Sequence, residues 1–253
     1  MSAQLAIQLY AVRGECEKSL AAALRDAAAH GYAGAEPWGH RGDAPTWRGL
    51  SGRDLRRLFD DAGIRCCGFH VATEALVGDN LARSIELNQA LGNRFLVIAA
   101  DKQRMSSAAG IDELARILTE ADRRLAPLGM FCGYHAHSFD FASVDGAVAW
   151  ESLFARLPDR VIMQLDTGNC VAGGGDPLAT LRRFPGRARS VHLKDHGVPE
   201  GGALGDGTID FAQIIRICRE LHPTEWFVVE EGEHAQGWDI AARSRAYLRT
   251  LGL

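Results

Sequence analysis

Six apolar runs of the sequence carry, at or near their ends, a side chain that can bind a metal ion or move a proton. These side chains belong to Glu36, His70, His135, Asp166, His192 and Glu230. Imidazole nitrogens and carboxylate oxygens are groups with which proteins hold divalent cations. Burying such groups costs free energy unless they pair with one another or bind a cation. The residue types therefore indicate a metal site combined with acid–base chemistry.

Four of these residues come from consecutive apolar runs in the second half of the chain. They are His135, Asp166, His192 and Glu230. If the runs are neighbouring parallel strands of a barrel, their ends converge on one point. We therefore predict that these four residues form the shell of one divalent metal ion.

Single members of this set also have plainer interpretations. An Asp after a strand is often a helix N-cap or a turn residue, which applies to Asp166. His70 is open to a structural role, Lys194 to a salt bridge, and Glu230 with Glu231 to being a solvated pair. The joint occurrence of four ligand types at four consecutive run ends favours the metal site over these separate explanations.

The elements that must position these residues are short apolar runs that alternate with helical patterns. The expected strands cover residues 5–10, 34–36, 64–70, 94–99, 130–135, 161–166, 190–194 and 226–230. The expected helices include residues 17–30, 54–62, 79–91, 111–127 and 239–250. Such alternation predicts a parallel sheet, because parallel neighbours need crossover connections. Eight units in 253 residues predict one domain over residues 1–253, a (β/α)₈ TIM barrel.

Three segments, residues 38–50, 101–110 and 196–209, are expected to be loops, the last of them glycine-rich and mobile near the mouth of the barrel. A doubly wound open sheet is the alternative architecture, but no GxGxxG follows a strand to support it. No GxSxG segment supports a hydrolase triad either.

The bulk composition excludes several classes of protein. The formal net charge is −4 and no Lys/Arg run occurs, which argues against nucleic-acid binding. The 6 cysteines are scattered and form no CxxC pair, which is typical of a reducing compartment. The first residues lack the pattern of a signal peptide, and no apolar stretch approaches the roughly 18 residues of a membrane span. We therefore expect a cytoplasmic protein without a membrane partner.

Several segments together resemble a known family. Residues 133–141, GYHAHSFDF, are similar to a YHNHxFEF motif, and further likenesses lie at residues 7–13, 31–36, 165–169, 191–195 and 205–230. These segments resemble the xylose isomerase-like barrel family, whose members are often named sugar phosphate isomerases/epimerases. The likeness covers essentially the whole chain and implies a TIM barrel, but it is not specific for one substrate.

The resemblance also implies roles for individual residues. It places one divalent ion, Mn²⁺ first with Mg²⁺, Co²⁺ or Zn²⁺ as alternatives, on the same four positions that the strand ends indicate. For proton transfer we expect the three residues His137, Glu230 and Lys194. For substrate binding we expect Glu36, His70 and Asn169, together with Tyr10 and Trp38. The two aromatic residues lie near expected strand ends, where rings either stack on a sugar or simply pack.

Two departures from the family pattern bear on the reaction. The resemblance implies a Glu at the strand-five ligand position, where this chain has His135. This difference argues against a symmetric epimerisation between two opposed glutamates. Ala136 also stands where the motif has Asn, which removes one expected hydrogen bond to the substrate.

The expected reaction is proton abstraction next to a carbonyl, giving a metal-stabilised enediolate. Reprotonation, the first expectation, would make the protein a keto-sugar isomerase or epimerase. Loss of a β-leaving group would make it a dehydratase or keto-glycoside lyase, and a non-catalytic sugar-binding protein is the third alternative. A multi-zinc endonuclease is disfavoured because too few ligands are present. The expected partner is a small carbohydrate, preferably unphosphorylated because no Lys/Arg cluster is evident, and a homo-oligomer is compatible with the family.

Overall fold

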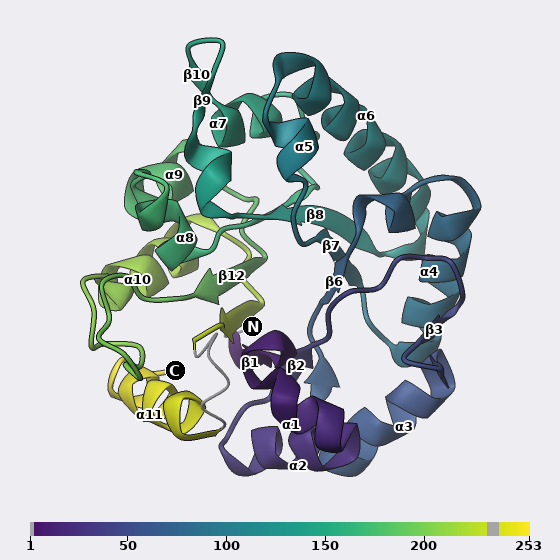
Figure 1. Ribbon diagram of the computed structural model, residues 1–253, viewed down its shortest axis with the longest axis vertical. Helices are drawn as coiled ribbons and strands as arrows, with labels where there is room; N and C mark the ends of the chain where they lie inside the picture. Colours follow the sequence, from purple (N-terminus) through teal and green to yellow (C-terminus); the bar gives the residue numbers. More distant parts are fainter. Residues whose placement is uncertain (1–2, 232–237) are drawn as a thin grey trace.

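The eight predicted apolar runs form parallel strands around a central axis, with the helices outside them (Figure 1). A computed structural model describes residues 3–231 and 238–253. The barrel strands are β1 (Gln4–Gln8), β2 (Gly34–Glu36), β5 (Arg65–Cys66), β6 (Phe69–Val71), β7 (Phe95–Ile98), β8 (Phe131–His135), β11 (Ile162–Gln164), β12 (Ser190–Leu193) and β13 (Trp226–Val229). The predicted (β/α)₈ barrel is confirmed.

The barrel is assembled from two parallel arcs of strands. One has the order β12-β13-β1-β2-β5 and the other the order β11-β8-β7-β6. They meet on one side where Asp166 and His192 form a parallel bridge, with the His192 amide donating to the Leu165 carbonyl at 2.8 Å. On the other side the His70 amide donates to the Pro37 carbonyl at 2.9 Å. Two predicted site residues thus lie at the first of these joins.

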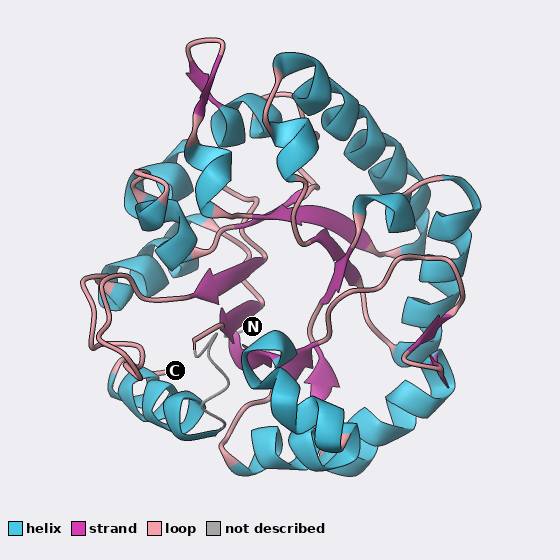
Figure 2. Cartoon of the chain, viewed as in Figure 1, coloured by secondary structure: helices cyan, strands magenta, loops and turns pink. Residues whose placement is uncertain are grey.

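The helices surround the strands (Figure 2). They are α1 (Arg13–Lys18), α2 (Leu20–Ala29), α3 (Gly52–Ala62), α4 (Gly78–Leu91), α5 (Lys102–Met105), α6 (Ala108–Leu125), α7 (Ala149–Phe154), α8 (Thr167–Ala172), α9 (Pro177–Arg183), α10 (Phe211–Leu221) and α11 (Trp238–Thr250). Short 3₁₀ helices are η1 (Leu9–Val12), η2 (Thr73–Leu76), η3 (Ala126–Leu128) and η4 (Ser138–Phe141). None of the helices within residues 3–231 and 238–253 combines the length and apolarity that crossing a membrane requires.

The longest helix, α6, illustrates how the outer layer is held in place. Its buried residues include Ile111, Leu114 and Leu118, which recur at the three- and four-residue spacing of one helix face. Ser107 begins the helix by accepting a hydrogen bond from the Gly110 amide at 3.2 Å. Each fully buried aliphatic side chain contributes roughly 1.5–3 kcal/mol, so the shell of helices is held mainly by its apolar faces.

The prediction of one strand over residues 64–70 is wrong in one respect. The segment forms two strands, β5 and β6. β5 pairs with β2, whereas β6 pairs with β7. Between them Gly68 passes so close to Glu36 that a Cβ atom there would lie 2.3 Å from the carboxylate Oε1. The interruption therefore makes room for a buried carboxylate inside the barrel.

Other local predictions also need correction. The first strand ends at Gln8, because its side-chain oxygen accepts a hydrogen bond from the Tyr10 amide at 3.2 Å and begins the 3₁₀ helix η1. Within the expected loop 38–50 the chain begins a two-stranded hairpin, β3 (Thr46–Trp47) with β4 (Leu50–Ser51). Residues 101–110 contain α5 and the start of α6. A second hairpin, β9 (Ser143–Val144) with β10 (Ala147–Val148), projects from the barrel (Figure 1).

The glycine-rich segment 196–209 is attached to the barrel end by one carboxylate. Asp195, two residues after β12, accepts hydrogen bonds from the amides of His196, Gly205, Gly207 and Ile209 at distances from 2.8 to 3.1 Å. A Cβ atom at Gly207 would lie 2.4 Å from Asp195 Oδ1. The glycine thus allows the backbone to wrap around this carboxylate.

The barrel interior has an apolar end and a polar end. Side chains alternate along a strand, so every second residue points inward. At the N-terminal ends of the strands a separate buried cluster fills the barrel, built from Ala6, Cys67, Phe95, Val97, Phe131, Ile162, Trp226 and Val228. At the C-terminal ends the buried residues are polar or charged instead, and this is where the predicted site lies.

Candidate metal centre

The four predicted ligands meet at the C-terminal end of the barrel. They are His135 at the end of β8, Asp166 after β11, His192 on β12 and Glu230 after β13. One ligand atom from each lies within 4.8 Å of the others. Three of the side chains are almost completely buried, and that of Glu230 is 13% exposed. Consecutive parallel strands therefore bring together a group that could hold a metal ion.

Asp166 caps a helix with one carboxylate oxygen and keeps the other oxygen for a second role. Its Oδ1 caps α8 by accepting a hydrogen bond from the Asn169 amide at 2.7 Å. Its Oδ2 is buried and has no hydrogen-bond partner among the described residues. Burial raises the pKa of this carboxyl to about 7. A buried carboxylate oxygen without a donor fits a site built for a cation, because leaving it unsatisfied costs free energy.

His192 lies between two carboxylates. Its Nε2 is 2.7 Å from Glu36 Oε2, and its Nδ1 is 2.5 Å from Glu230 Oε2. Burial acts to lower the pKa of His192, but Glu36 and Glu230 outweigh it and raise the pKa to about 10. Burial likewise acts to raise the pKa of Glu230, but the hydrogen bond and charge of His192 hold it at about 2. Without a bound metal these contacts favour a protonated imidazole, so His192 would have to release the proton on Nδ1 for that nitrogen to bind an ion.

His135 supplies a neutral nitrogen to the same group. Its Nε2 lies 4.0 Å from Asp166 Oδ2 and 3.9 Å from Glu230 Oε2, and its Nδ1 lies 3.1 Å from Gln164 Oε1. Burial first, and then the neighbouring His192, lower the pKa of His135 well below its ordinary value. An uncharged imidazole and two carboxylates are suitable donors for a divalent ion, so the residues present fit the group that the fold family implies.

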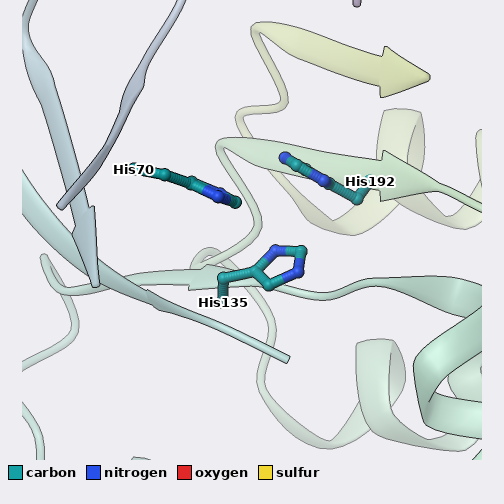
Figure 3. A group of neighbouring side chains, drawn as sticks. All are labelled: His70, His135 and His192. Carbon is teal, nitrogen blue, oxygen red and sulfur yellow. The ribbon is translucent and has the colours of Figure 1, made fainter. Parts of the chain in front are cut away.

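Three buried histidines, His70, His135 and His192, also converge from three strands (Figure 3). Their nitrogens approach one another because they share two oxygen partners. Gln164 Oε1 lies near His70 and His135, and Glu36 Oε2 lies near His70 and His192. His70 Nε2 lies 2.7 Å from Gln164 Oε1 and 3.2 Å from Glu36 Oε2, the oxygen that His192 also contacts. Side-chain oxygens thus satisfy the Nε2 atoms of His70 and His192, and the amide nitrogen of Gln8 lies 3.3 Å from His70 Nδ1. These partners favour the four-residue group as the cation site.

Three buried polar residues of the interior were not predicted as part of the site: Gln8, Gln164 and Ser190. Gln8 donates to Glu36 Oε2 at 2.8 Å, and Gln164 donates to Glu36 Oε1 and to Ser190 Oγ at 3.0 Å each. The signal that could have found them is alternation. Gln164 stands two residues before Asp166 and Ser190 two before His192, so each faces inward like its partner.

The three residues expected to transfer protons lie close to this group in different ways. Glu230 belongs to it, and the charge of Lys194 acts on both Asp166 and Glu230. A Cβ atom at Gly168 would lie 2.8 Å from Lys194 Cγ, so the glycine makes room for the lysine. The ring of His137 lies edge-on to that of His135, with centroids 5.1 Å apart.

The residues expected to bind substrate divide into an inner and an outer set. Glu36 and His70 are buried in the network described above. The side chain of Asn169 donates to the Ala136 carbonyl at 3.0 Å, bridging the ends of β8 and β11. Tyr10 and Trp38 contact each other edge-on, with centroids 5.7 Å apart, and Tyr10 is 41% exposed.

Each ring of the outer aromatic pair packs against one arginine. The guanidinium of Arg13 lies 4.5 Å from the ring centroid of Tyr10, and that of Arg48 lies 4.8 Å from the centroid of Trp38. This arrangement shows packing between the segments that follow β1 and β2. A role of these rings in stacking on a sugar stays a prediction.

Comparison with known proteins gives a family and several relatives. The sequence profile of a family described as "Xylose isomerase-like TIM barrel" matches residues 24–251. Two curated relatives are named inosose dehydratase. The protein from Lacticaseibacillus casei is 29% identical over 163 residues, covering 54% of each chain. That from Geobacillus kaustophilus is 31% identical over 174 residues, covering 60% of this chain and 54% of the relative. This chain thus spans about half the length of the curated relatives it matches.

Among solved structures, a sugar phosphate isomerase/epimerase from Parabacteroides distasonis superimposes with a TM-score of 0.85. It is 22% identical, and the alignment covers 98% of this chain and 94% of that one. A likeness at that level of identity supports the fold and leaves the reaction open.

Proposed function

The chain belongs to the xylose isomerase-like TIM-barrel family, and on that premise we propose that it is a divalent-metal-dependent enzyme that removes a proton next to the carbonyl of a carbohydrate-derived ketone. The observation that carries the proposal is the group formed by His135, Asp166, His192 and Glu230. The buried Asp166 Oδ2, without a hydrogen-bond donor among the described residues, is the feature that a bound cation explains best.

These four residues would hold the ion, with Mn²⁺ as the first candidate. A divalent ion supplies Lewis-acid polarisation of carbonyl and hydroxyl oxygens, which makes the adjacent C–H bond more acidic. The protein's own contribution is to fix the donors. Hydrogen bonds from the Asn169 amide to Asp166 and from His135 to Gln164 hold two of the four side chains in position.

Proton transfer then falls to groups at the edge of the site. The carboxylate of Glu230 is the least buried member of the metal group and is the first candidate for the base. Lys194, whose charge acts on Glu230, and His137, whose ring lies beside that of His135, are the candidates for returning a proton or assisting a leaving group.

Two outcomes of proton removal remain as candidates. Elimination of water is the one we favour, because the strand-five ligand is His135 rather than a second glutamate opposed to Glu230. The names of the curated relatives agree with it. Isomerisation or epimerisation is the second candidate, because His137 and Lys194 both lie near the group and offer more than one proton donor.

Proton-exchange experiments test both candidates together. The purified protein is incubated in D₂O with Mn²⁺ or Co²⁺ and a panel of unphosphorylated ketoses and keto-inositols, and the products are followed by NMR and ultraviolet absorbance. Elimination gives an absorbing unsaturated ketone, whereas isomerisation gives a deuterated isomer. If neither an unsaturated ketone nor a deuterated compound forms from any candidate, with metal bound, the proposed reaction is contradicted and a sugar-binding protein is favoured.

A matched pair of variants tests the assignment of the base. Glu230→Gln, compared with the wild type at equal metal content per chain by elemental analysis, is expected to lower turnover about 10²–10⁴-fold, the range typical of general acid–base groups. Glu231→Gln, which changes the neighbouring carboxylate, should retain far more activity. The assignment would be wrong if the two variants behaved alike.

A further inference from the structure

One buried amide inside the barrel contacts His135, which belongs to the metal group, and His70, which lies beside it. Gln164 lies on β11 and is completely buried. Its amide nitrogen donates to Glu36 Oε1 and Ser190 Oγ, and its amide oxygen lies 2.7 Å from His70 Nε2 and 3.1 Å from His135 Nδ1. All four hydrogen-bonding positions of the side chain are therefore in use.

The orientation of this amide follows from the chemistry of its partners. An ionised carboxylate only accepts hydrogen bonds, so the NH₂ group of Gln164 must face Glu36. Turning the amide over would place its oxygen against the carboxylate and leave an NH₂ group between two histidine rings. The amide oxygen must therefore face His70 and His135.

An oxygen that only accepts requires a proton on each ring nitrogen facing it. His135 must then carry its proton on Nδ1, which leaves Nε2 with a lone pair. That Nε2 is the atom that lies 4.0 Å from Asp166 Oδ2 and 3.9 Å from Glu230 Oε2. The lone pair thus points into the candidate metal group.

The same reasoning fixes the tautomer of His70, which is also in contact with Gln164. Figure 3 shows the rings of His70 and His135. The Nε2 of His70 must donate, since both oxygens near it belong to acceptors, Gln164 Oε1 and Glu36 Oε2. Its Nδ1 lies 3.3 Å from the amide nitrogen of Gln8. Because the oxygen of Gln8 accepts from the Tyr10 amide, its NH₂ group faces His70 and makes Nδ1 an acceptor.

We propose that Gln164 is a positioning residue that locks His135 as the Nδ1–H tautomer and His70 as the Nε2–H tautomer, so that the Nε2 lone pair of His135 is ready for a metal ion. The role in metal binding rests on the proposed function, whereas the two tautomers can be observed in the protein without any metal. A glutamine is suited to the task because one amide can accept from two rings while anchoring itself to Glu36.

The test reads the tautomers directly. Long-range ¹H–¹⁵N NMR of the metal-free protein, with ¹⁵N-labelled histidine, distinguishes a protonated Nδ1 from a protonated Nε2. The His135 signals are assigned by their loss in His135→Gln. We expect a single Nδ1–H form for His135 and a single Nε2–H form for His70. A His135 ring protonated mainly on Nε2 would overturn the proposal without the need for any Gln164 variant.

Variants then connect the tautomer to metal binding. Gln164→Met keeps the side-chain volume but removes the acceptor, so His135 should become a mixture of tautomers. Co²⁺ affinity measured by calorimetry should fall about 10–100-fold, the range typical of residues that orient metal ligands. Ser190→Ala removes a partner of the Gln164 amide nitrogen without touching either ring, and it should leave both the tautomer and the affinity close to wild type.

The outcomes separate this proposal from the proposed function. If Gln164→Met leaves the His135 tautomer and the Co²⁺ affinity unchanged, or if Ser190→Ala weakens Co²⁺ binding as much, Gln164 is merely a packing residue. If the wild-type protein shows the expected tautomers but binds no Co²⁺, the tautomer assignment stands and the metal site fails. If Gln164→Met does not fold, the wild-type spectrum still decides the tautomers.

Discussion

The two ends of the barrel carry charged side chains in opposite ways. At the C-terminal end the charges lie inside, where Asp166 and His192 are completely buried. At the N-terminal end they lie around an apolar plug, which is the buried cluster of the barrel interior that includes Phe131. The guanidinium groups of Arg160 and Arg189 each lie 4.4 Å from the Phe131 ring centroid, and their side chains are 40% and 29% exposed.

This difference assigns folding stability mainly to the N-terminal end of the barrel and metal binding to the C-terminal end. A guanidinium over an aromatic ring keeps part of its hydration and gains a cation–π contact, so it costs little to place. A carboxylate inside the barrel loses its hydration and is kept only with compensating charge or a bound cation. We therefore expect substitutions at the N-terminal end to change folding stability, and those at the C-terminal end to change metal binding.

The largest effect on stability is expected at the plug. Phe131→Ala should lower the free energy of unfolding by about 3–5 kcal/mol, because it opens a cavity under two arginines and beside Phe95, whose ring centroid is 5.6 Å away. Urea denaturation measures the loss, and calorimetry should show unchanged metal stoichiometry. Loss of metal binding in a protein that is still folded would contradict the separation of the two ends.

The next effect lies at the C-terminal end and distinguishes the two roles of Asp166. Asp166→Asn keeps an oxygen for the Asn169 amide but replaces the free carboxylate oxygen, whereas Asp166→Ala removes both. Each variant should weaken metal binding about 100-fold or more, since ligand removal exceeds the 10–100-fold effect of residues that only orient ligands. Only Asp166→Ala should lose the capping contribution, about 1 kcal/mol. Equal stability of the two variants would remove the capping role.

A smaller effect is expected from the arginines over the plug. Arg189→Ala should lower the free energy of unfolding by about 1 kcal/mol, because it loses a ring contact and an ion pair with Glu225 at 3.0 Å. Chemical denaturation measures the free energy of unfolding with and without saturating Co²⁺. The stabilisation that Co²⁺ adds should be the same in Arg189→Ala as in the wild type. A changed Co²⁺ contribution would show that the two ends are coupled.

The smallest effect belongs to an exposed ion pair at the same end. Arg94 lies 2.6 Å from Glu225, but its side chain is 52% exposed. Arg94→Ala should change the free energy of unfolding by only about 0.5 kcal/mol, since water screens such pairs. Thermal unfolding at low and high salt checks this expectation. A loss as large as that of Phe131→Ala would mean that the arginines, and not the plug, dominate the stability of this end.

The barrel and the four candidate ligands could be predicted from the sequence, because both depend on residues that are close together along the chain. Each strand is a short apolar run, and each ligand stands at or near the end of its run, so neither prediction required knowledge of distant contacts. Asp166 is instructive because capping and ligand chemistry were posed as alternatives. The structure assigns one oxygen to the cap and leaves the other facing the group.

Features that depend on distant parts of the chain were not predicted. The break in the third strand follows from the close approach of Gly68 to Glu36, which comes from another strand. Gln8 and Gln164 are neutral polar residues within apolar runs, and only the inward alternation of a closed barrel reveals that they meet Glu36. The arginines over Phe131 likewise come from two separate strand starts.

The central claim is that the C-terminal end of the barrel holds one divalent ion. The most direct test is elemental analysis of the purified protein after incubation with Mn²⁺ and removal of excess ion, beside an Asp166→Ala/His192→Ala double variant whose folding is checked by circular dichroism. The account predicts about one ion per chain in the wild type and none in the double variant. A wild-type protein that retains no ion, or a double variant that retains it equally, would contradict the claim.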